Sequence, residues 1–389
     1  MPRLRSMPLA LLALSCLPAC DAGTSDSAWD DADFRAQAAA AVEAYVHVVV
    51  ANYDESVSAA GRMQADIAAF LDAPSEASLG RARKSWLAAR EVYGQTETFR
   101  FYGGPIDKDE PLINSWPLDE VYIDYVEGDP NGGIINDLGT PIDRDTLIAR
   151  NAAGGEDDIS TGWHAIEFLL WGQDLRADGP GARPYTDYLT DGTGTAANQD
   201  RRAAYLELVT TLLLENLNAV GAAWAEDAAY HDEFERGDPK DSLTKVLLGM
   251  ASLSGAELSG ERMTVAFDTR EQEDEHSCFS DNTHRDLYNN ALGIENVYLA
   301  TYGGVGHGVS LSSLVAARDP ALDEALRAQL RASVDAMAAI PPPFDQAIQA
   351  PDGDPAREAV AAAIAALKAQ TSTIADVAAL LDITLNLEE

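Results

Sequence analysis

Two shortages limit what this 389-residue chain can be, because it has few cysteines and few basic residues. Cys16 and Cys20 lie at the extreme N-terminus, so only Cys278 remains in the body of the chain and no intramolecular disulfide is expected there. The 64 acidic residues outnumber the 27 lysines and arginines, which gives a formal net charge of −37. Such an acidic chain is not expected to bind nucleic acid or to adsorb to anionic lipid.

Several familiar functional motifs are also missing from the sequence. There is no glycine-rich phosphate loop before a helix and no Gly-x-Ser-x-Gly elbow. The chain also lacks His-Glu-x-x-His and its inverted form, the motifs that supply two histidine ligands to a hydrolytic zinc ion. These absences remove the motif-based arguments for nucleotide binding, for an α/β-hydrolase and for a zinc protease of the common type.

Alternation with a period of two residues, the pattern of a half-buried strand, is scarce in this chain. Alanine, leucine, valine and acidic residues recur instead at helical spacing, so we predict an all-α protein. Long irregular stretches rich in Gly, Pro, Asn and Asp interrupt the helices, and loops of that length inside a compact protein are usually functional. They cover residues 103–158, 174–198 and 267–282.

A faint repeat divides the chain into two halves. Each half offers a long helix, a second helix with Glu97 or Glu261, an acidic irregular stretch and then a shorter helix. We therefore predict two packed helical bundles, at residues 33–198 and 199–389, and the repeat suggests an internal duplication.

The N-terminus has the pattern of a processing signal. A basic region with Arg3 and Arg5 precedes an apolar stretch that is too short to span a bilayer. The sequence Leu-Pro-Ala-Cys that ends at Cys20 then resembles the lipobox of bacterial lipoproteins. We predict a signal peptide at residues 1–19, lipidation of Cys20 and a flexible tether at 20–32. The alternative is an ordinary secretory signal with an incidental cysteine.

The most informative segment runs from Trp163 to Trp171. It contains no Gly or Pro and is apolar nearly all round, so it predicts a buried helix. His164 and Glu167 are three residues apart, which places them on the same face of that helix. A buried carboxylate and imidazole need a partner, and a metal ion suits both.

A second stripe of functional residue types precedes this segment. It mixes aromatic and charged side chains at a spacing of four, three, four and three residues, as expected for one face of a helix that lines a polar cleft. The alternative is a partly exposed face with local ion pairs. The members of the stripe are Trp86, Arg90, Tyr93, Glu97 and Arg100.

A third candidate region is the acidic run from Glu271 to His284. It is rich in oxygen ligands for hard metals and contains His276, His284 and the single Cys278. A mixture of histidine and carboxylate ligands suits iron, and ferric iron favours carboxylate oxygen in particular. The alternative is a solvated loop that also caps the following helix.

Together these segments resemble the imelysin-like family, which has a Gly-x-His-x-x-Glu signature. The signature matches residues 162–167, with the Trp-Pro-Leu-Asp-Glu stretch at 116–120 before it. The stretch at 273–284 resembles the branch of iron-regulated lipoproteins in this family. The resemblance covers essentially the whole chain from about Phe34 onward.

The resemblance implies two packed helical bundles in a lipid-anchored protein of the bacterial cell envelope, facing the periplasm or the cell surface. It implies iron uptake, so the expected cargo is iron, preferably Fe³⁺, or an iron chelate. The expected partners are other envelope proteins of iron uptake, and the lipid anchor is the expected membrane contact. By position the metal ligands would be His164, Glu167 and Glu97, with Arg100, Asp274 and Ser277 around them.

Two alternatives stay open beside iron binding. Some family members are classed as metallopeptidases, but the motif supplies neither an evident third ligand nor a general base, so we expect iron handling rather than proteolysis. The third possibility is a cleft without metal, in which arginines such as Arg90 and Arg100 bind a carboxylate ligand.

Overall fold

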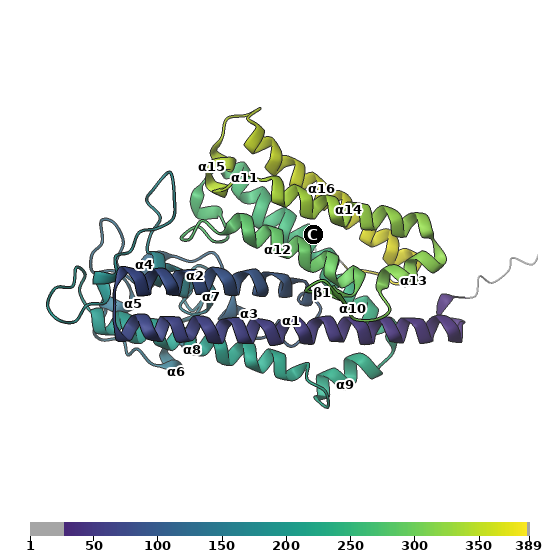
Figure 1. The fold of residues 1–389 in the computed structure, drawn as a ribbon, viewed down its shortest axis with the longest axis horizontal. Coiled ribbons are helices and arrows are strands. Elements are labelled where there is room, and N and C mark those ends of the chain that lie inside the picture. The colour runs from purple at the N-terminus through teal and green to yellow at the C-terminus, as the bar shows by residue number, and fades with distance from the viewer. Residues whose placement is uncertain (1–26, 387–389) are drawn as a thin grey trace, which may run out of the picture.

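The computed structural model describes residues 27–386 and confirms the all-α prediction. Within this range the named strands are β1 (Thr301–Tyr302) and β2 (Val305–Gly306), which form one short antiparallel hairpin. The longest helix, α1 (Ala32–Asp72), runs along the length of the molecule in Figure 1. At about 1.5 Å per residue its 41 residues span roughly 60 Å.

The first bundle is built on the left part of α1 in Figure 1. α1 continues through Gly61, because a single glycine costs only about 1 kcal/mol in a helix. α2 ends at Gly94, and the chain tightens there into the 3₁₀-helix η2, so the predicted helix through Arg100 is shorter than expected. The elements that pack on α1 here are α2 (Glu76–Tyr93), η2 (Gly94–Phe99) and α8 (Gln199–Ala223), and α7 (Gly162–Trp171) packs on α2 and α8.

The position of α8 shows that the boundary between the two bundles lies later in the chain than predicted. α8 packs against α1 and α7, and its buried residues Tyr205, Leu213 and Leu217 belong to the first bundle. The first bundle therefore extends beyond the predicted boundary at residue 198. A helix that is apolar on one face stays with the surface that buries that face, whatever the repeat in the sequence suggests.

Most of the second bundle lies above the middle and right part of α1 in Figure 1, whereas α9 (Ala229–Arg236) lies below α1. One long helical run forms the base of this bundle and consists of α10, the π-helix η4 and α11. Helices α12 and α16 pack on this run, and α14 packs on both of them. The elements are α9 (Ala229–Arg236), α10 (Pro239–Ser252), η4 (Leu253–Val265), α11 (Ala266–Thr269), η5 (Gln272–Asp274), α12 (Thr283–Leu299), α13 (Leu311–Arg318), α14 (Pro320–Ala339), α15 (Phe344–Gln349) and α16 (Pro355–Leu380).

The long irregular stretch between α2 and α7 is partly ordered into short helices beside the first bundle. Its backbone is held by side-chain caps such as Asp119 and Asp143, which accept hydrogen bonds from the first turns of the helices they precede. Its helices are α3 (Glu110–Ile113), α4 (Glu120–Ile123), α5 (Gly133–Asn136) and α6 (Arg144–Arg150), and η3 (Tyr185–Tyr188) follows α7.

The start of the described chain differs from the predicted tether. Residues 27–31 form the short 3₁₀-helix η1 (Ala28–Asp30) with its caps, and Trp29 is buried with its indole N–H donated to the carbonyl of Leu381. Trp29 orders this segment because its indole is buried and bonds a residue near the C-terminal end of the same chain. The predicted flexible tether at 20–32 is therefore too long by residues 27–31. The signal peptide and Cys20 lie outside the described residues.

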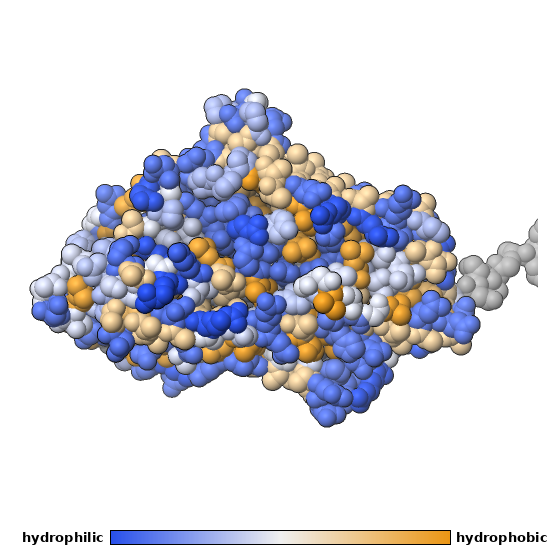
Figure 2. Space-filling view, in the orientation of Figure 1, coloured by the Kyte–Doolittle hydropathy of each residue, from blue (hydrophilic) through white to orange (hydrophobic). Residues whose placement is uncertain are grey.

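The face seen in Figure 2 is mainly hydrophilic, with small apolar areas between charged ones. Five large apolar side chains are exposed in the described range: Leu138, Leu175, Val265, Val305 and Val309. No helix among residues 27–386 combines the length and the apolar character that a membrane crossing would need. Cys278 is a free thiol and is partly buried.

Candidate functional site

Helix α7 carries the His–Glu pair, and a glycine fixes where it begins. Every residue of α7 is buried, as the sequence predicts. Gly162 has a φ of +87°, and a Cβ added there would lie 2.5 Å from the carbonyl oxygen of Ile113. Only glycine can adopt this backbone with the chain from α3 pressed against it. The glycine of the signature is therefore a packing requirement that brings His164 to the interface.

His164 and Glu167 contact each other and the second bundle. The Nδ1 atom of His164 lies 2.9 Å from Oε2 of Glu167. The other oxygen, Oε1, accepts hydrogen bonds from the backbone N–H and the hydroxyl of Ser280, at 3.0 and 2.6 Å. Burial raises the pKa of Glu167 to about 8, and burial, aided by Arg90, lowers the pKa of His164 to about 3. The Nε2 atom of His164 is buried without a hydrogen-bond partner in the described chain.

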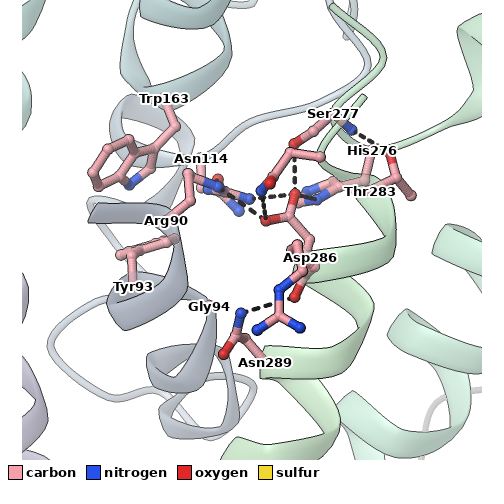
Figure 3. A network of polar contacts seen from close by, with 12 residues as sticks. Arg90, Tyr93, Gly94, Asn114, Trp163, His276, Ser277, Thr283, Asp286 and Asn289 are labelled. Atoms are coloured by element: carbon pink, nitrogen blue, oxygen red, sulfur yellow. Dashed lines mark hydrogen bonds and ion pairs between the residues drawn. The ribbon is translucent and has the colours of Figure 1, made fainter. Parts of the chain in front are cut away.

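A second histidine faces the first across the bundle interface. The ring centroids of His276 and His164 are 4.7 Å apart, with the rings edge to face. His276 Nδ1 lies 3.2 Å from the carboxylate of Asp286 on α12. Figure 3 shows Arg90 of α2 reaching the same carboxylate, with contacts of 3.2 and 2.9 Å. Burial alone would raise the pKa of Asp286, but Arg90 and His276 hold it well below its usual range.

Glu97 belongs to a neighbouring cluster of ion pairs. Its Oε2 accepts hydrogen bonds from Arg100 at 2.7 Å and from Arg262 of η4 at 2.5 Å. Burial alone would raise the pKa of Glu97, yet these two guanidinium groups hold it well below its usual range. Arg262 also contacts Glu257 at 2.7 Å, and Arg100 pairs with Glu110 at 3.1 Å. Arg262 therefore bridges the first bundle and η4.

These clusters border a polar pocket of about 320 Å³ between the two halves. His276 forms part of its wall, and four glutamates and two arginines contribute the charges. The charged lining residues are Glu110, Glu156, Glu257, Glu261, Arg100 and Arg262. Trp116 and Pro117 separate this pocket from a second one of about 270 Å³, which contains five further carboxylates and Cys278.

The remaining predicted site residues lie apart from the His–Glu pair. Asp274 is at the end of η5, accepts a hydrogen bond from Thr269 and lines the second pocket. Ser277 donates its hydroxyl to Asp286, so it helps to orient the carboxylate that holds His276. Burial raises the pKa of the Cys278 thiol well above its usual range, which disfavours a reactive thiolate.

Sequence reasoning missed three residues at the centre of the site: Arg262, Ser280 and Asp286. Ser280 and Asp286 lie in or just after the acidic run that the sequence marked, and their polar neighbours gave no signal that set them apart. Arg262 could not be placed because η4 is π-helical. A periodicity of 3.6 residues assigns its side chain to the wrong face.

The fold and the site together define an all-α protein of two bundles that meet at a buried His–Glu pair on a glycine-started helix. The chain belongs to the imelysin family, whose family model matches residues 49–374. The sequence is 26% identical over 334 residues to Iron-regulated protein A of Synechococcus elongatus, covering 82% of this chain and 80% of that protein.

Two solved structures share the fold. One is a candidate iron-regulated protein A precursor from Parabacteroides distasonis, with a TM-score of 0.69 and 20% identity, covering 89% of this chain and 95% of that one. The other is an imelysin-like protein from Psychrobacter arcticum, with a TM-score of 0.63 and 12% identity, covering 92% of this chain and 99% of that one.

The arrangement of side chains shows whether this site could hold a permanently bound metal ion. Within residues 27–386, no group of three or more His, Cys, Asp and Glu side chains is arranged to hold a metal ion. Arginines already occupy Asp286 and Glu97, and His164 is bonded to Glu167. A catalytic zinc ion needs three protein ligands and an open position, and this arrangement of side chains does not fit one.

Proposed function

We propose that this protein is a lipid-anchored, extracytoplasmic imelysin-like protein that binds iron as cargo and acts in iron uptake. The iron would enter the pocket of about 320 Å³ between the bundles, as the ion or as a small chelate. The name of the relative from Synechococcus elongatus supports a link to iron. The observation that carries the proposal is His276, which lines this pocket and is oriented by Asp286.

The protonation of the His276–Asp286 pair leaves a nitrogen free for iron. Because the pKa of Asp286 is held so low, the proton between the two groups belongs to Nδ1 of His276. Burial, followed by the nearby Arg262, lowers the pKa of His276 to about 3, so the imidazole is neutral at pH 7. Its Nε2 atom therefore carries a lone pair. Metal-binding histidines are typically oriented by a carboxylate in this way.

The charges around the pocket favour a cation over an anion. Four glutamates face two arginines, and each arginine is already paired with a carboxylate. The surplus of negative charge would attract a cation, as does the net charge of −37 on the whole chain. Binding of an anionic ligand by free arginines, the alternative open from the sequence, finds less support in this pairing.

Ferric titration of the purified protein, followed by absorbance and metal analysis, tests the proposal. We expect one iron per wild-type protein, loss of that iron in His276→Ala, and weaker binding in His164→Ala because its ring packs against His276. His231→Ala is the matched control, since His231 is also buried but bonds Trp224 and Glu235 away from the pocket. Equal iron binding by all four proteins would overturn the assignment of the site.

A further inference from the structure

Arg262 occupies a position between two carboxylates that a bound cation would otherwise neutralise. Its guanidinium lies 2.5 Å from Oε2 of Glu97 and 2.7 Å from Oε1 of Glu257, and its Nη1 donates to Asn290 at 2.7 Å. Its side chain is only 3% exposed. A guanidinium group is permanently charged and pairs with carboxylates in a fixed geometry, so it neutralises such a pair without a metal ion.

Glu97, the carboxylate of the first bundle that Arg262 contacts, lacks hydrogen-bond donors from residues 27–386 on one of its two oxygens. Both arginines at Glu97 bond to the same oxygen, Oε2. The other oxygen, Oε1, is buried and has no hydrogen-bond partner among the described residues. A buried carboxylate oxygen without a donor costs free energy, and a bound cation would remove that cost.

The π-helical geometry of η4 is what permits this arrangement. Glu257 and Arg262 are five residues apart, and in an α-helix of about 3.6 residues per turn such residues point to different faces. In a π-helix the hydrogen bond runs from residue i to residue i+5, so the two side chains come together. The hydroxyl of Thr264, which donates to the carbonyl of Ser259, repeats the same spacing. π-Helical stretches are rare and often mark functional sites.

We propose that Arg262 is a built-in competitor for cargo iron, held between Glu97 and Glu257 by the π-helical stretch. Iron takes these two carboxylates, whose oxygens both bond to Nη2 of Arg262, only when Arg262 moves away. Return of η4 to α-helical geometry would carry Arg262 off the face it shares with Glu257. The competition lowers the affinity for iron and so allows the cargo to be released to the next component of uptake. This inference rests on the proposed function of the pocket.

Iron binding by variants of Arg262 tests the competition. In Arg262→Gln, ferric affinity is expected to rise by about tenfold or more, because one positive charge within a few ångströms of the ion is removed. Arg262→Lys keeps the charge and is expected to stay close to wild type. Glu97→Gln combined with Arg262→Gln is expected to lose the gain, because the freed carboxylate is then absent.

Arg285→Gln is the matched control, since it also removes an arginine paired with a glutamate, Glu91, but at a half-exposed position. Circular dichroism confirms that each variant is folded. Unchanged or weaker binding in folded Arg262→Gln, with iron bound by wild type, would overturn the competitor and leave the proposed function standing. Binding by Arg262→Gln alone would support the competitor and overturn iron binding by the unmodified protein. Absence of binding in every variant would overturn both.

Discussion

Asp124 in the first bundle and Glu97 at the bundle interface are both buried carboxylates held by two arginines. Oδ2 of Asp124 accepts hydrogen bonds from Arg183 and Arg202, both at 2.6 Å. Its Oδ1 accepts hydrogen bonds from Arg202 at 2.8 Å and from Asn136 at 3.3 Å. Both oxygens of Asp124 therefore have donors, whereas among residues 27–386 Glu97 has donors on one oxygen only.

Within the described residues, the surroundings of Glu97 also contain more buried polar atoms without hydrogen-bond partners than those of Asp124. Near Asp124, the Nε atom of Arg183 is buried and has no hydrogen-bond partner in the part of the chain that the structure describes. Near Glu97 and the His–Glu pair, such atoms are more numerous and include His164 Nε2, Arg100 Nε and Asn114 Nδ2. A buried carboxylate with donors on both oxygens is accounted for by its structural role, while a group of buried polar atoms without partners needs a further explanation, such as a functional role.

The largest expected effect is on the free energy of unfolding, which should fall more when Asp124 is replaced than when Glu97 is. Asp124→Asn leaves buried Arg202 without a carboxylate partner in the described chain and buried Arg183 with Asp187 alone, at 3.5 Å, so we expect a loss of about 3–5 kcal/mol in the free energy of unfolding. Glu97→Gln should cost clearly less, because Arg262 keeps Glu257 and Arg100 keeps Glu110. Urea denaturation of both variants measures the difference. Equal losses would show that the two clusters play the same structural role.

An intermediate effect is expected at the glycine that sets α7. Gly162→Ala forces a side chain into the left-handed region and against Ile113, so we expect a loss of about 1–3 kcal/mol from backbone strain, with the clash in addition. Gly80→Ala is the control, because its added Cβ meets open space inside α2 and should stabilise by up to about 1 kcal/mol. Thermal unfolding compares the two. A mild effect at Gly162 would mean that α7 can shift without disturbing the interface.

A gradual pH dependence is expected at Glu167, and its effect within any one pH unit is the smallest of the three. Its pKa is raised to about 8 in the folded protein, so between its ordinary value of 4.5 and 8 the folded state binds a proton that the unfolded state releases. Stability from this group is complete below pH 4.5 and is lost as the pH rises to 8, on the order of 1 kcal/mol per pH unit. Glu167→Gln cannot titrate, so its stability relative to wild type should improve steadily from pH 5 to 8. A constant difference across this range would contradict the buried, protonated carboxyl.

Much of the fold followed from helical periodicity, and the reason is physical. α7 is apolar on every side, and such a segment is stable only when buried, so its place in the core could be predicted from residues 163–171 alone. The pairing of His164 with Glu167 likewise follows from their spacing. Both depend on contacts within one helix.

What the sequence could not show depends on contacts between distant segments. Asp286 is separated by 196 positions from Arg90, its ion-pair partner, and nothing local marks it among the polar residues of α12. The glycine at position 94, where α2 ends, also depends on a distant residue, because a Cβ there would lie 2.9 Å from the side chain of Asn289. The π-helical geometry of η4 could not be predicted either, because the periodicity argument assumes 3.6 residues per turn. The third predicted ligand, Glu97, stays a prediction that the competitor experiment addresses.

Helix α1 packs on α2 and α8 of one bundle and on α10 and α13 of the other. Because one uninterrupted rod is part of both bodies, the bundles cannot swing apart like the lobes of a hinged binding protein without bending it. Capture and delivery would then be local events of side chains and of one helical stretch, on the timescale of such motions rather than of domain closure. The dwell time of the cargo would be determined by how often Arg262 returns to its carboxylates.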